Sequence, residues 1–264
     1  MLFGKDRAGE GGKEFMKSFI SEDDIEKSLL EELKKPEFNY DILLCEPTPE
    51  KKDDLNDGTG RTSKKQCVLP SILRSSMYRL NPKVEKSKLD EEFEKLTSDF
   101  SDSDLVDVNY KLYKKIRDYI KIKKGGPKDD DFDFVKLVDF ENPENNVFTA
   151  VSQMWIQGRY NYRRPDVIIF VNGMPFVFIE LKNSTVKVEE AYNKNLKSYL
   201  KDIPNIFAFN QICVLSNGIE TRIGSITATY DYFFEWLKSD ENDNIDRERI
   251  KDEGVSVKYF IHGL

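Results

Sequence analysis

The spacing of apolar residues predicts helices in the first half of the chain. Between residues 21 and 35, isoleucine and leucine recur at helical spacing, and the run stops before Pro36. The four residues Ser21-Glu22-Asp23-Asp24 are typical of a capping box at a helix N-terminus. We therefore expect an amphipathic helix over residues 21–35. Residues 69–122 show further helical periodicity and predict a helical region.

Short apolar runs and polar segments predict strands and loops around these helices. Residues 40–45 form a short strand candidate, and the polar residues 47–68 predict a long exposed loop. The charged run at residues 121–131 is typical of a second solvated loop. The alternation that follows predicts a strand over residues 132–140. The positions expected on its favoured faces are Phe132, Phe134 and Val138.

The second half of the chain contains the most informative apolar runs. Residues 147–156 favour a strand. Two further runs, at residues 167–171 and 176–181, are joined by a segment that begins with Asn172-Gly173. Because Asn-Gly between two β-rich runs is the strongest short-range hairpin signal, we expect these runs to pair as a β-hairpin.

A helix and two strands are expected after the hairpin. Residues 184–201 favour a helix, residues 206–218 a buried strand, and residues 220–224 a further strand. The order is helix, strand, long insertion, hairpin, helix, strand, strand. This order indicates the α/β class, with a mixed sheet flanked by helices. The expected stripe along the helix consists of Val188, Tyr192, Asn195 and Tyr199.

Composition narrows the classes of protein that fit. The 264 residues suffice for one large domain, and 34% of them are charged. We find no apolar stretch of about 20 residues and no secretory leader, so we expect a soluble cytoplasmic protein that does not contact membranes. The cysteines lack metal-ligand spacing, and the single histidine, His262, has no nucleophile motif near it. A zinc site and a histidine-based catalytic mechanism are therefore disfavoured.

The formal net charge of −7 constrains how the protein could meet nucleic acid. Tight non-specific binding to DNA uses surplus lysine and arginine against phosphates. The charge argues against a free-standing binder of naked duplex. It remains compatible with a nuclease domain whose substrate is delivered by another component.

Three polar residues stand at the ends of the two expected hairpin strands. Asp166 stands at the start of the first strand, and Glu180 and Lys182 stand at the end of the second. Because side chains alternate along a strand, Glu180 and Lys182 share one face while Leu181 points into the core. An antiparallel pair that turns near Gly173 sets position 166 opposite position 180. We therefore expect two neighbouring carboxylates with a lysine beside them.

This constellation favours metal-dependent phosphodiester hydrolysis. Two carboxylates on apolar strands are costly unless a cation neutralises them, and Mg²⁺ binds to one or two carboxylates plus waters and phosphate oxygens. The metal would polarise the phosphoryl group, while Lys182 would orient or help deprotonate the attacking water. The alternative is structural, with Glu180 and Lys182 as a solvent-facing pair and Asp166 as a strand cap. The location at the ends of adjacent apolar strands favours the catalytic interpretation.

Residues 139–183, together with similar pieces that extend the likeness to residues 70–264, resemble a known family. The long string RPD…FVNG.P…IELKN is similar to the N-terminal nuclease domain of the motor (restriction) subunit of type I restriction–modification enzymes. The resemblance implies a restriction-endonuclease-like fold with a PD-(D/E)xK active site. By the same resemblance Asp166, Glu180 and Lys182 are catalytic, the two carboxylates bind Mg²⁺ (or Mn²⁺), and the carbonyl of Leu181 is a further metal ligand.

The resemblance also suggests accessory residues. The first helix of the family often supplies a glutamate, for which Glu26 fits best and Glu22 is the alternative; a solvated helix face is the competing interpretation. Related nucleases carry Q-x-x-x-Y on the helix after the motif, where this chain has Asn195 and Tyr199. The i, i+4 spacing places both on one helix face, but Asn replaces Gln, and Tyr199 also fits a core position.

The resemblance implies a domain arrangement and partners. Residues 1–20 would form a tail and residues 21–264 the nuclease domain, with an inserted loop and helical region at about 47–130. We find no phosphate-binding loop motif, so ATP would be used only by a translocase motor expected after residue 264. The implied partners are double-stranded DNA and the methyltransferase and specificity subunits. The alternatives are a catalytically silent binding or assembly module of the same fold, and a repair or junction-resolving nuclease.

Overall fold

The fold is built on a seven-stranded mixed sheet, with strand order β1-β4-β7-β8-β9-β10-β11. The computed structural model describes residues 20–45, 55, 57–100, 103–124, 131–236, 248, 250, 254 and 256–261. β1–β4 and β8–β9 pair in parallel, and the other neighbours pair antiparallel. The strands are β1 (Asp41–Leu44), β4 (Phe148–Ser152), β7 (Val167–Val171), β8 (Met174–Leu181), β9 (Ile212–Ser216), β10 (Thr221–Gly224) and β11 (Phe234–Glu235).

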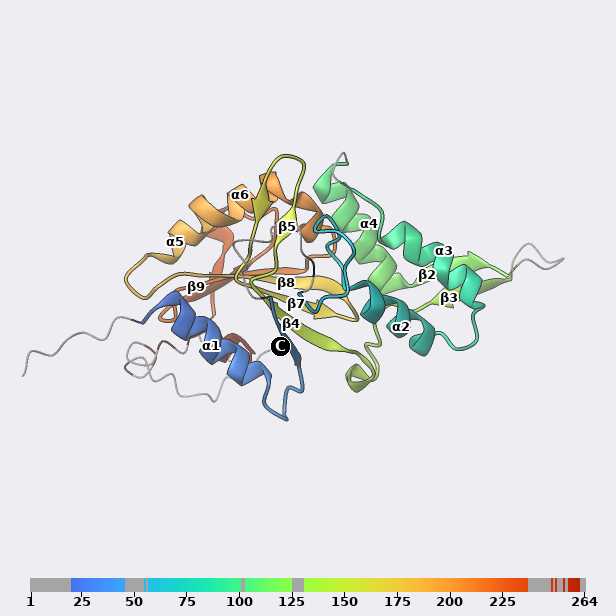
Figure 1. Cartoon of the computed structure of the whole chain (residues 1–264), viewed down its shortest axis with the longest axis horizontal. Coiled ribbons are helices and arrows are strands. Elements are labelled where there is room, and N and C mark those ends of the chain that lie inside the picture. Colours follow the sequence, from blue (N-terminus) through green and yellow to red (C-terminus); the bar gives the residue numbers. More distant parts are fainter. Residues whose placement is uncertain are drawn as a thin grey trace, which may run out of the picture.

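Helices cover both faces of this sheet. Figure 1 shows α1 (blue) below the sheet and α5 and α6 (orange) above it, with α2, α3 and α4 together at the right. This is the α/β, restriction-endonuclease-like architecture that the sequence predicts. No helix of the described part is long and apolar enough to cross a membrane. The helices are α1 (Glu22–Leu33), α2 (Pro70–Leu80), α3 (Lys86–Leu96), α4 (Leu105–Asp118), α5 (Val188–Glu190), the π-helix η2 (Ala191–Leu196), α6 (Lys197–Asp202) and α8 (Ser256–Ile261); short 3₁₀ turns are η1 (Pro143–Asn145), η3 (Pro204–Phe207) and η4 (Tyr230–Tyr232).

The continuous apolar run of β7 follows from its burial on both faces. Val167 and Ile169 pack in one core cluster with α1 and α8. Ile168 and Phe170 pack in another cluster with η2 and α6. A strand covered on both faces needs apolar residues at every position, which is why this segment lacks polar alternation.

The first helix forms as its sequence predicts. The Ser21 hydroxyl accepts a hydrogen bond from the Asp24 amide at 3.2 Å, and the Asp24 carboxylate accepts from the Ser21 amide at 3.3 Å. This reciprocal pair is the expected capping box. The helix ends at Leu33, two residues before the expected boundary.

The helical insertion packs against the turn end of the central hairpin. Val171 and Met174, on either side of the turn, belong to the core cluster that α2, α3 and α4 share with the two-stranded sheet β2 (Ile120–Lys123) and β3 (Phe132–Val135). The expected helical region therefore exists, but it ends at Asp118, before the predicted residue 122.

The predicted exposed loop at residues 47–68 is wrong for the part that the structure describes. Residues 46–54 and 56 lie outside the described residues, and among residues 57–68 several polar side chains are buried. The Arg61 guanidinium donates to the Asp57 carboxylate at 2.8 Å and to the Trp155 carbonyl at 3.1 Å. Polar composition suggested solvent, but these groups satisfy one another inside the protein.

The predictions for residues 121–140 need two corrections. Lys121–Lys123 belong to β2 rather than to a solvated loop, while residues 125–130 lie outside the described part. β3 ends at Val135, which is buried, and Phe134 is 58% exposed, so Phe134 does not lie on a core-facing side. Val138 is buried as expected.

The segment after the central hairpin also departs from the expected boundaries. The helix expected from residue 184 begins at Val188, and the strand expected from residue 206 begins at Ile212 as β9.

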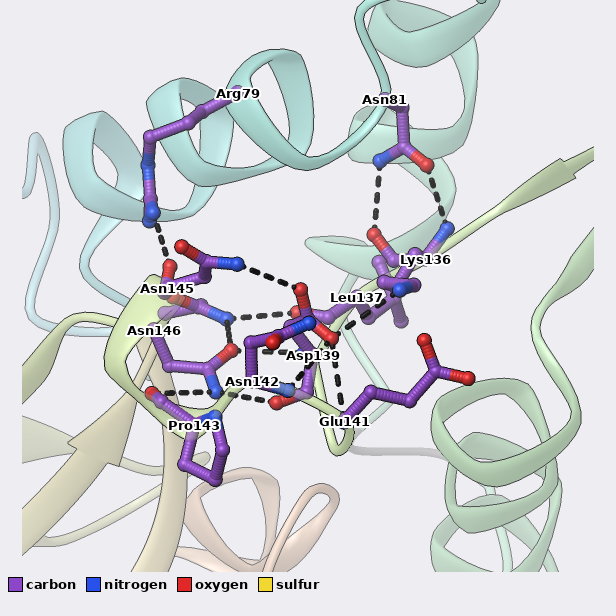
Figure 2. A network of polar contacts seen from close by, with 11 residues as sticks. Arg79, Asn81, Lys136, Leu137, Asp139, Glu141, Asn142, Pro143, Asn145 and Asn146 are labelled. Carbon is purple, nitrogen blue, oxygen red and sulfur yellow. Dashed lines mark hydrogen bonds and ion pairs between the residues drawn. The ribbon is translucent and has the colours of Figure 1, made fainter.

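A polar network ends β3 early (Figure 2). The Asn81 side chain accepts from the Lys136 amide at 2.7 Å and donates to the Lys136 carbonyl at 2.8 Å. The Asp139 carboxylate accepts from the Glu141 amide and from the Asn145 side chain. These bonds satisfy the local backbone in a turn, so no strand partner is required there.

Candidate active site

The site forms where β7 and β8 end together. β7 starts at Val167, whereas β8 continues to Leu181, so the Leu181 main chain extends past the end of its neighbour. The Asp166 Oδ2 atom accepts a hydrogen bond of 2.7 Å from the Leu181 amide. Asp166 therefore replaces a strand partner at this position.

A β-bulge sets the register that brings the two carboxylates together. Near the turn Val171 pairs with Met174, but beyond a shift between Ile169 and Phe170, Val167 pairs with Ile179. The extra residue in β8 changes the sum of paired residue numbers from 345 to 346. Continuing this register by one step places position 166 beside position 180, as the sequence predicts.

Glu180 and Lys182 lie against each other beside the same strand end. Glu180 is 1% exposed, and its Oε1 atom accepts from Lys182 Nζ at 2.9 Å. Lys182 Nζ also donates to the Leu181 carbonyl at 2.6 Å. The second carboxylate oxygen of Glu180, Oε2, is buried without a hydrogen-bond partner among the described residues. A buried carboxylate oxygen of this kind suits a bound cation.

The pKa shifts of Asp166, Glu180 and Lys182 also favour a cation at this site. Burial raises the pKa of Asp166 to about 6, against the hydrogen bond from Leu181 and the nearby Lys182 ammonium. Burial and then the Asp166 carboxylate raise the pKa of Glu180 well above its usual value. Burial alone would lower the pKa of Lys182, but Glu180 and Asp166 outweigh it and raise that pKa. Both carboxylates would therefore be stabilised by an additional cation.

Helix α1 brings both candidate glutamates to this site. Glu26 accepts from the Ser152 hydroxyl and, through Oε2, from Gln153 Nε2 at 2.6 Å; the same Gln153 nitrogen lies 3.4 Å from Asp166 Oδ1. Glu22 Oε1 lies 3.8 Å from Lys182 Nζ. The two glutamates, one helical turn apart, thus approach different members of the cluster.

Sequence reasoning missed Gln153. Its side chain bridges Glu26 and Asp166, and its main-chain amide donates to the Asp166 main-chain carbonyl at 2.8 Å. Its φ of 57° lies in the left-handed region, which is uncommon for a residue other than glycine and occurs often at functional sites. The available signal was its position directly after β4, the strand next to Asp166.

Asn195 and Tyr199 lie on the helical segment that follows the motif, and Tyr199 is part of the core. Tyr199 is 7% exposed, packs edge-on against Phe178, and its hydroxyl donates to the Arg164 carbonyl at 3.4 Å. Burial raises the pKa of Tyr199, and a hydrogen bond from the half-buried Asn195 opposes the shift. Tyr199 is thus a core residue that borders the site, on the same sheet face as Glu180.

Comparison with known proteins identifies the family. The family model described as "Type I restriction enzyme R protein N terminus" matches residues 19–232. The chain belongs to this family. The type I restriction enzyme HindI endonuclease subunit of Haemophilus influenzae is 34% identical over 250 residues, which are 93% of this chain and 23% of that subunit. The EcoprrI endonuclease subunit of Escherichia coli is 35% identical over 115 residues, covering 40% of this chain and 36% of the relative.

Membership of the R protein N-terminal family supports a nuclease role in a restriction system. The relatives are endonuclease subunits of type I restriction enzymes, and the chain spans about a quarter of the length of the HindI subunit. The match includes the β7–β8 hairpin and the carboxylates at its open end.

The R protein family suggests use of a divalent metal, and the oxygens of the site suit one. No three His, Cys, Asp or Glu side chains form a metal-binding group in the part of the chain that the structure describes. The oxygens that could hold such a metal are those of the Asp166 and Glu180 carboxylates and the Leu181 carbonyl. A cavity of about 350 Å³ opens beside Asp166, and Glu26, Gln153 and Arg164 also line it. Mg²⁺ commonly takes few protein ligands and keeps several waters.

Proposed function

We propose that the chain is the metal-dependent endonuclease domain of a type I restriction subunit, and that it hydrolyses phosphodiester bonds of double-stranded DNA after ATP-driven translocation by the full-length subunit. The observation that carries the proposal is the pair of carboxylates, Asp166 and Glu180, held with Lys182 at the open end of the β7–β8 hairpin. The partners would be duplex DNA and the methyltransferase and specificity subunits. ATP would serve a motor region outside this chain.

Each residue of the cluster has a role in this proposal. Asp166, Glu180 and the Leu181 carbonyl hold Mg²⁺, with Mn²⁺ as a substitute, and the metal when bound supplies a Lewis acid for the phosphate and lowers the pKa of water. Lys182 orients the attacking water and stabilises negative charge that builds on the phosphate. Gln153 holds Asp166 and Glu26 in place. Glu26 and Glu22 lie close enough to add negative charge around the metal.

The test is plasmid cleavage by the complete restriction complex with ATP and Mg²⁺. We expect Asp166→Ala, Glu180→Ala and Lys182→Ala each to abolish cleavage, because each removes a metal ligand or the lysine. Asp107→Ala on α4 is the control, since it also removes one carboxylate but at an exposed position. Near wild-type cleavage by any one of the three variants would remove that residue from the catalytic site.

A second experiment distinguishes a restriction domain from a junction-resolving nuclease. A restriction domain supplied with DNA by a motor should cut poorly by itself, because an acidic chain releases few counterions on binding linear duplex. We expect little cutting of supercoiled plasmid or four-way junctions by this chain alone with Mg²⁺ and no ATP. Strong junction-selective cutting under those conditions would favour the resolvase interpretation.

A further inference from the structure

A small basic hairpin precedes the site and is not used by the proposed catalysis. β5 (Ile156–Gln157) and β6 (Tyr162–Arg163) pair antiparallel, and residues 156–165 contain three arginines and no acidic residue. The side chain of Tyr160 at its tip is 83% exposed, with the Arg159 guanidinium 5.5 Å from its ring. In a chain with a net charge of −7, this is a local concentration of positive charge and exposed aromatic surface.

Hydrogen bonds and a close main-chain contact hold the hairpin against the end of α6. The Asp202 carboxylate accepts from Asn161 Nδ2 at 3.0 Å and from Arg163 Nε at 2.8 Å. Gly158 lies so close that a Cβ atom there would be 1.7 Å from the Asp202 carbonyl oxygen. Only glycine fits this approach. The tip residues are thus presented on a fixed support, which reduces the entropy lost when they bind a partner.

The hairpin lies on the catalytic face of the sheet (Figure 1). Side chains alternate, so Asp166 and Glu180 share the face of Ile168 and Phe178, which η2 and α6 cover. The hairpin is fixed to that same helix. Arg164, whose guanidinium lies 5.4 Å from the Trp155 ring, lines the cavity beside Asp166.

A groove beside the hairpin brings Lys201 close to the hairpin tip. The groove, of about 380 Å³, lies between the hairpin tip and the end of α6, and Arg159, Tyr160 and Lys201 line it. Phosphate oxygens are bound by arginine and lysine, and tyrosine also contacts the sugar–phosphate backbone. Asp202 also lines the groove, where it is paired with Arg163. Arg159 and Lys201 add positive charge there, and Arg164 adds it in the cavity beside Asp166.

We propose that the β5–β6 hairpin is a duplex-DNA contact that binds the phosphate backbone next to the bond to be cut. The proposal rests on the proposed function, because it takes duplex DNA as the substrate. Arg159, Lys201 and Arg164 bind successive phosphates, and Tyr160 packs against the sugar–phosphate backbone. These cations offset the repulsion between DNA phosphates and the acidic cluster, so that the backbone can approach Asp166. The contact reads no bases, since it addresses phosphate and sugar.

Photocrosslinking tests the contact without requiring cleavage. Tyr160 is replaced by benzoylphenylalanine in the full-length Lys182→Ala subunit, assembled with its partner subunits and labelled duplex DNA under ATP. The control carries the same replacement at Tyr110, which is 57% exposed. Tyr110 lies on α4, in the helical insertion that packs against the turn of the β7–β8 hairpin. We expect DNA adducts from position 160 and not from position 110. Adducts of position 160 with protein alone, or equal DNA adducts from both positions, would overturn the proposal.

A cleavage experiment uses a charge-matched pair of variants. Arg159→Ala/Tyr160→Ala removes one cation and its aromatic neighbour, and Lys114→Ala/Tyr110→Ala removes a pair with the same 5.5 Å separation on α4. We expect the hairpin variant to cut about ten-fold more slowly at physiological salt, with a salt slope lower by about one, and the control to stay within about two-fold of wild type. Equal rates for both variants would overturn the hairpin contact while leaving the proposed function intact. Cleavage that survives Asp166→Ala would instead contradict the proposed catalytic site, and the crosslink would still report on the hairpin.

Discussion

The amide of Leu181 donates a 2.7 Å hydrogen bond to Oδ2 of Asp166. Because β7 begins only at Val167, this amide has no strand partner, and the Asp166 side chain takes that place. The Leu181 carbonyl accepts from Lys182 Nζ, while the Leu181 side chain is fully buried. One apolar residue thus anchors the strand in the core and contributes main-chain groups to the site. This explains why the residue between Glu180 and Lys182 is apolar.

Removing the charge of Asp166 should stabilise the metal-free protein. Burial raises the pKa of the Asp166 carboxyl from 3.8 to about 6. The folded protein therefore holds this proton more tightly than the unfolded chain. The stability that the protonated carboxyl contributes is fully present below pH 3.8 and is lost as the pH rises through 6. Asp166→Asn keeps an acceptor for the Leu181 amide and removes the charge. We expect its free energy of unfolding at pH 8 to rise by about 1–3 kcal/mol, with little change at pH 4.

Urea denaturation with a chelator at pH 4 and pH 8 measures this effect. Asp107→Asn is the control, since that carboxylate is exposed and paired with Lys111. A lower stability of Asp166→Asn than of wild type at pH 8 would show that the ionised carboxylate stabilises the fold.

Gln153 should position the site rather than stabilise the fold. Gln153→Gly removes the side chain that bridges Glu26 and Asp166 and relieves the left-handed backbone, because glycine adopts φ of 57° without strain. We expect metal affinity or cleavage to fall by about 10- to 100-fold, while stability is unchanged or raised. The measurements are Mn²⁺ binding by calorimetry and cleavage by the complete complex.

Gln211→Gly serves as the matched control, because the Gln211 side chain donates only a local hydrogen bond to Phe209 among the contacts described. If Gln153→Gly kept wild-type metal affinity and cleavage, the bridge would have no functional role.

The central hairpin could be predicted because its signals are local. Asn172 and Gly173 both have positive φ, of 50° and 82°, and form the expected two-residue turn. Centring the turn on Gly173 placed position 166 opposite 180, but the turn is actually centred between the two residues. Without the bulge, which inserts Phe176, the register would place 166 beside Ile179. The predicted neighbourhood is therefore right, but its physical cause was not visible in the sequence.

Long-range polar contacts could not be predicted. Arg61 donates to the carbonyl of Trp155, 94 residues away, and Gln153 bridges α1 to the start of β7. Composition reports only that such residues are polar. Whether water or a distant part of the chain satisfies them depends on the tertiary structure. The family resemblance named Glu26 and Glu22 as candidates, whereas Gln153 had no motif to indicate it.

The buried Arg61 should contribute strongly to stability. Its side chain is fully buried and donates to Asp57 at 2.8 Å and to the carbonyls of Gln66 and Trp155 at 3.1 Å. Arg61→Ala would leave these acceptors without their donor, and we expect a loss of about 3–5 kcal/mol in the free energy of unfolding. Arg117→Ala, which breaks an exposed pair with Asp118, should cost at most about 1 kcal/mol. Equal losses in urea denaturation would mean that segment 57–68 is not held by Arg61.

Lys182 should compete with the metal that it assists. Its Nζ atom lies 2.9 Å from Glu180 Oε1 and 2.6 Å from the Leu181 carbonyl, and the Glu180 carboxylate and that carbonyl both hold the metal in the proposed mechanism. A cation that takes the Leu181 carbonyl therefore requires the ammonium to release it. Lys182→Met keeps most of the aliphatic stem and removes the charge. Two carboxylates without a neighbouring ammonium attract a divalent cation more strongly, so we expect Mg²⁺ or Mn²⁺ to bind at least about three-fold more tightly.

Cleavage by the same variant should nevertheless be lost, because no group remains to orient the water and stabilise the phosphate. Calorimetry with Mn²⁺ on this chain and plasmid cleavage by the complete complex give the two readouts. Lys111→Met, on the exposed face of α4, makes the same charge change away from the site and should alter neither. Tighter metal binding together with lost cleavage separates the roles of Lys182 and the carboxylates. Weaker binding by Lys182→Met would show that the ammonium supports the metal site instead of sharing its ligands.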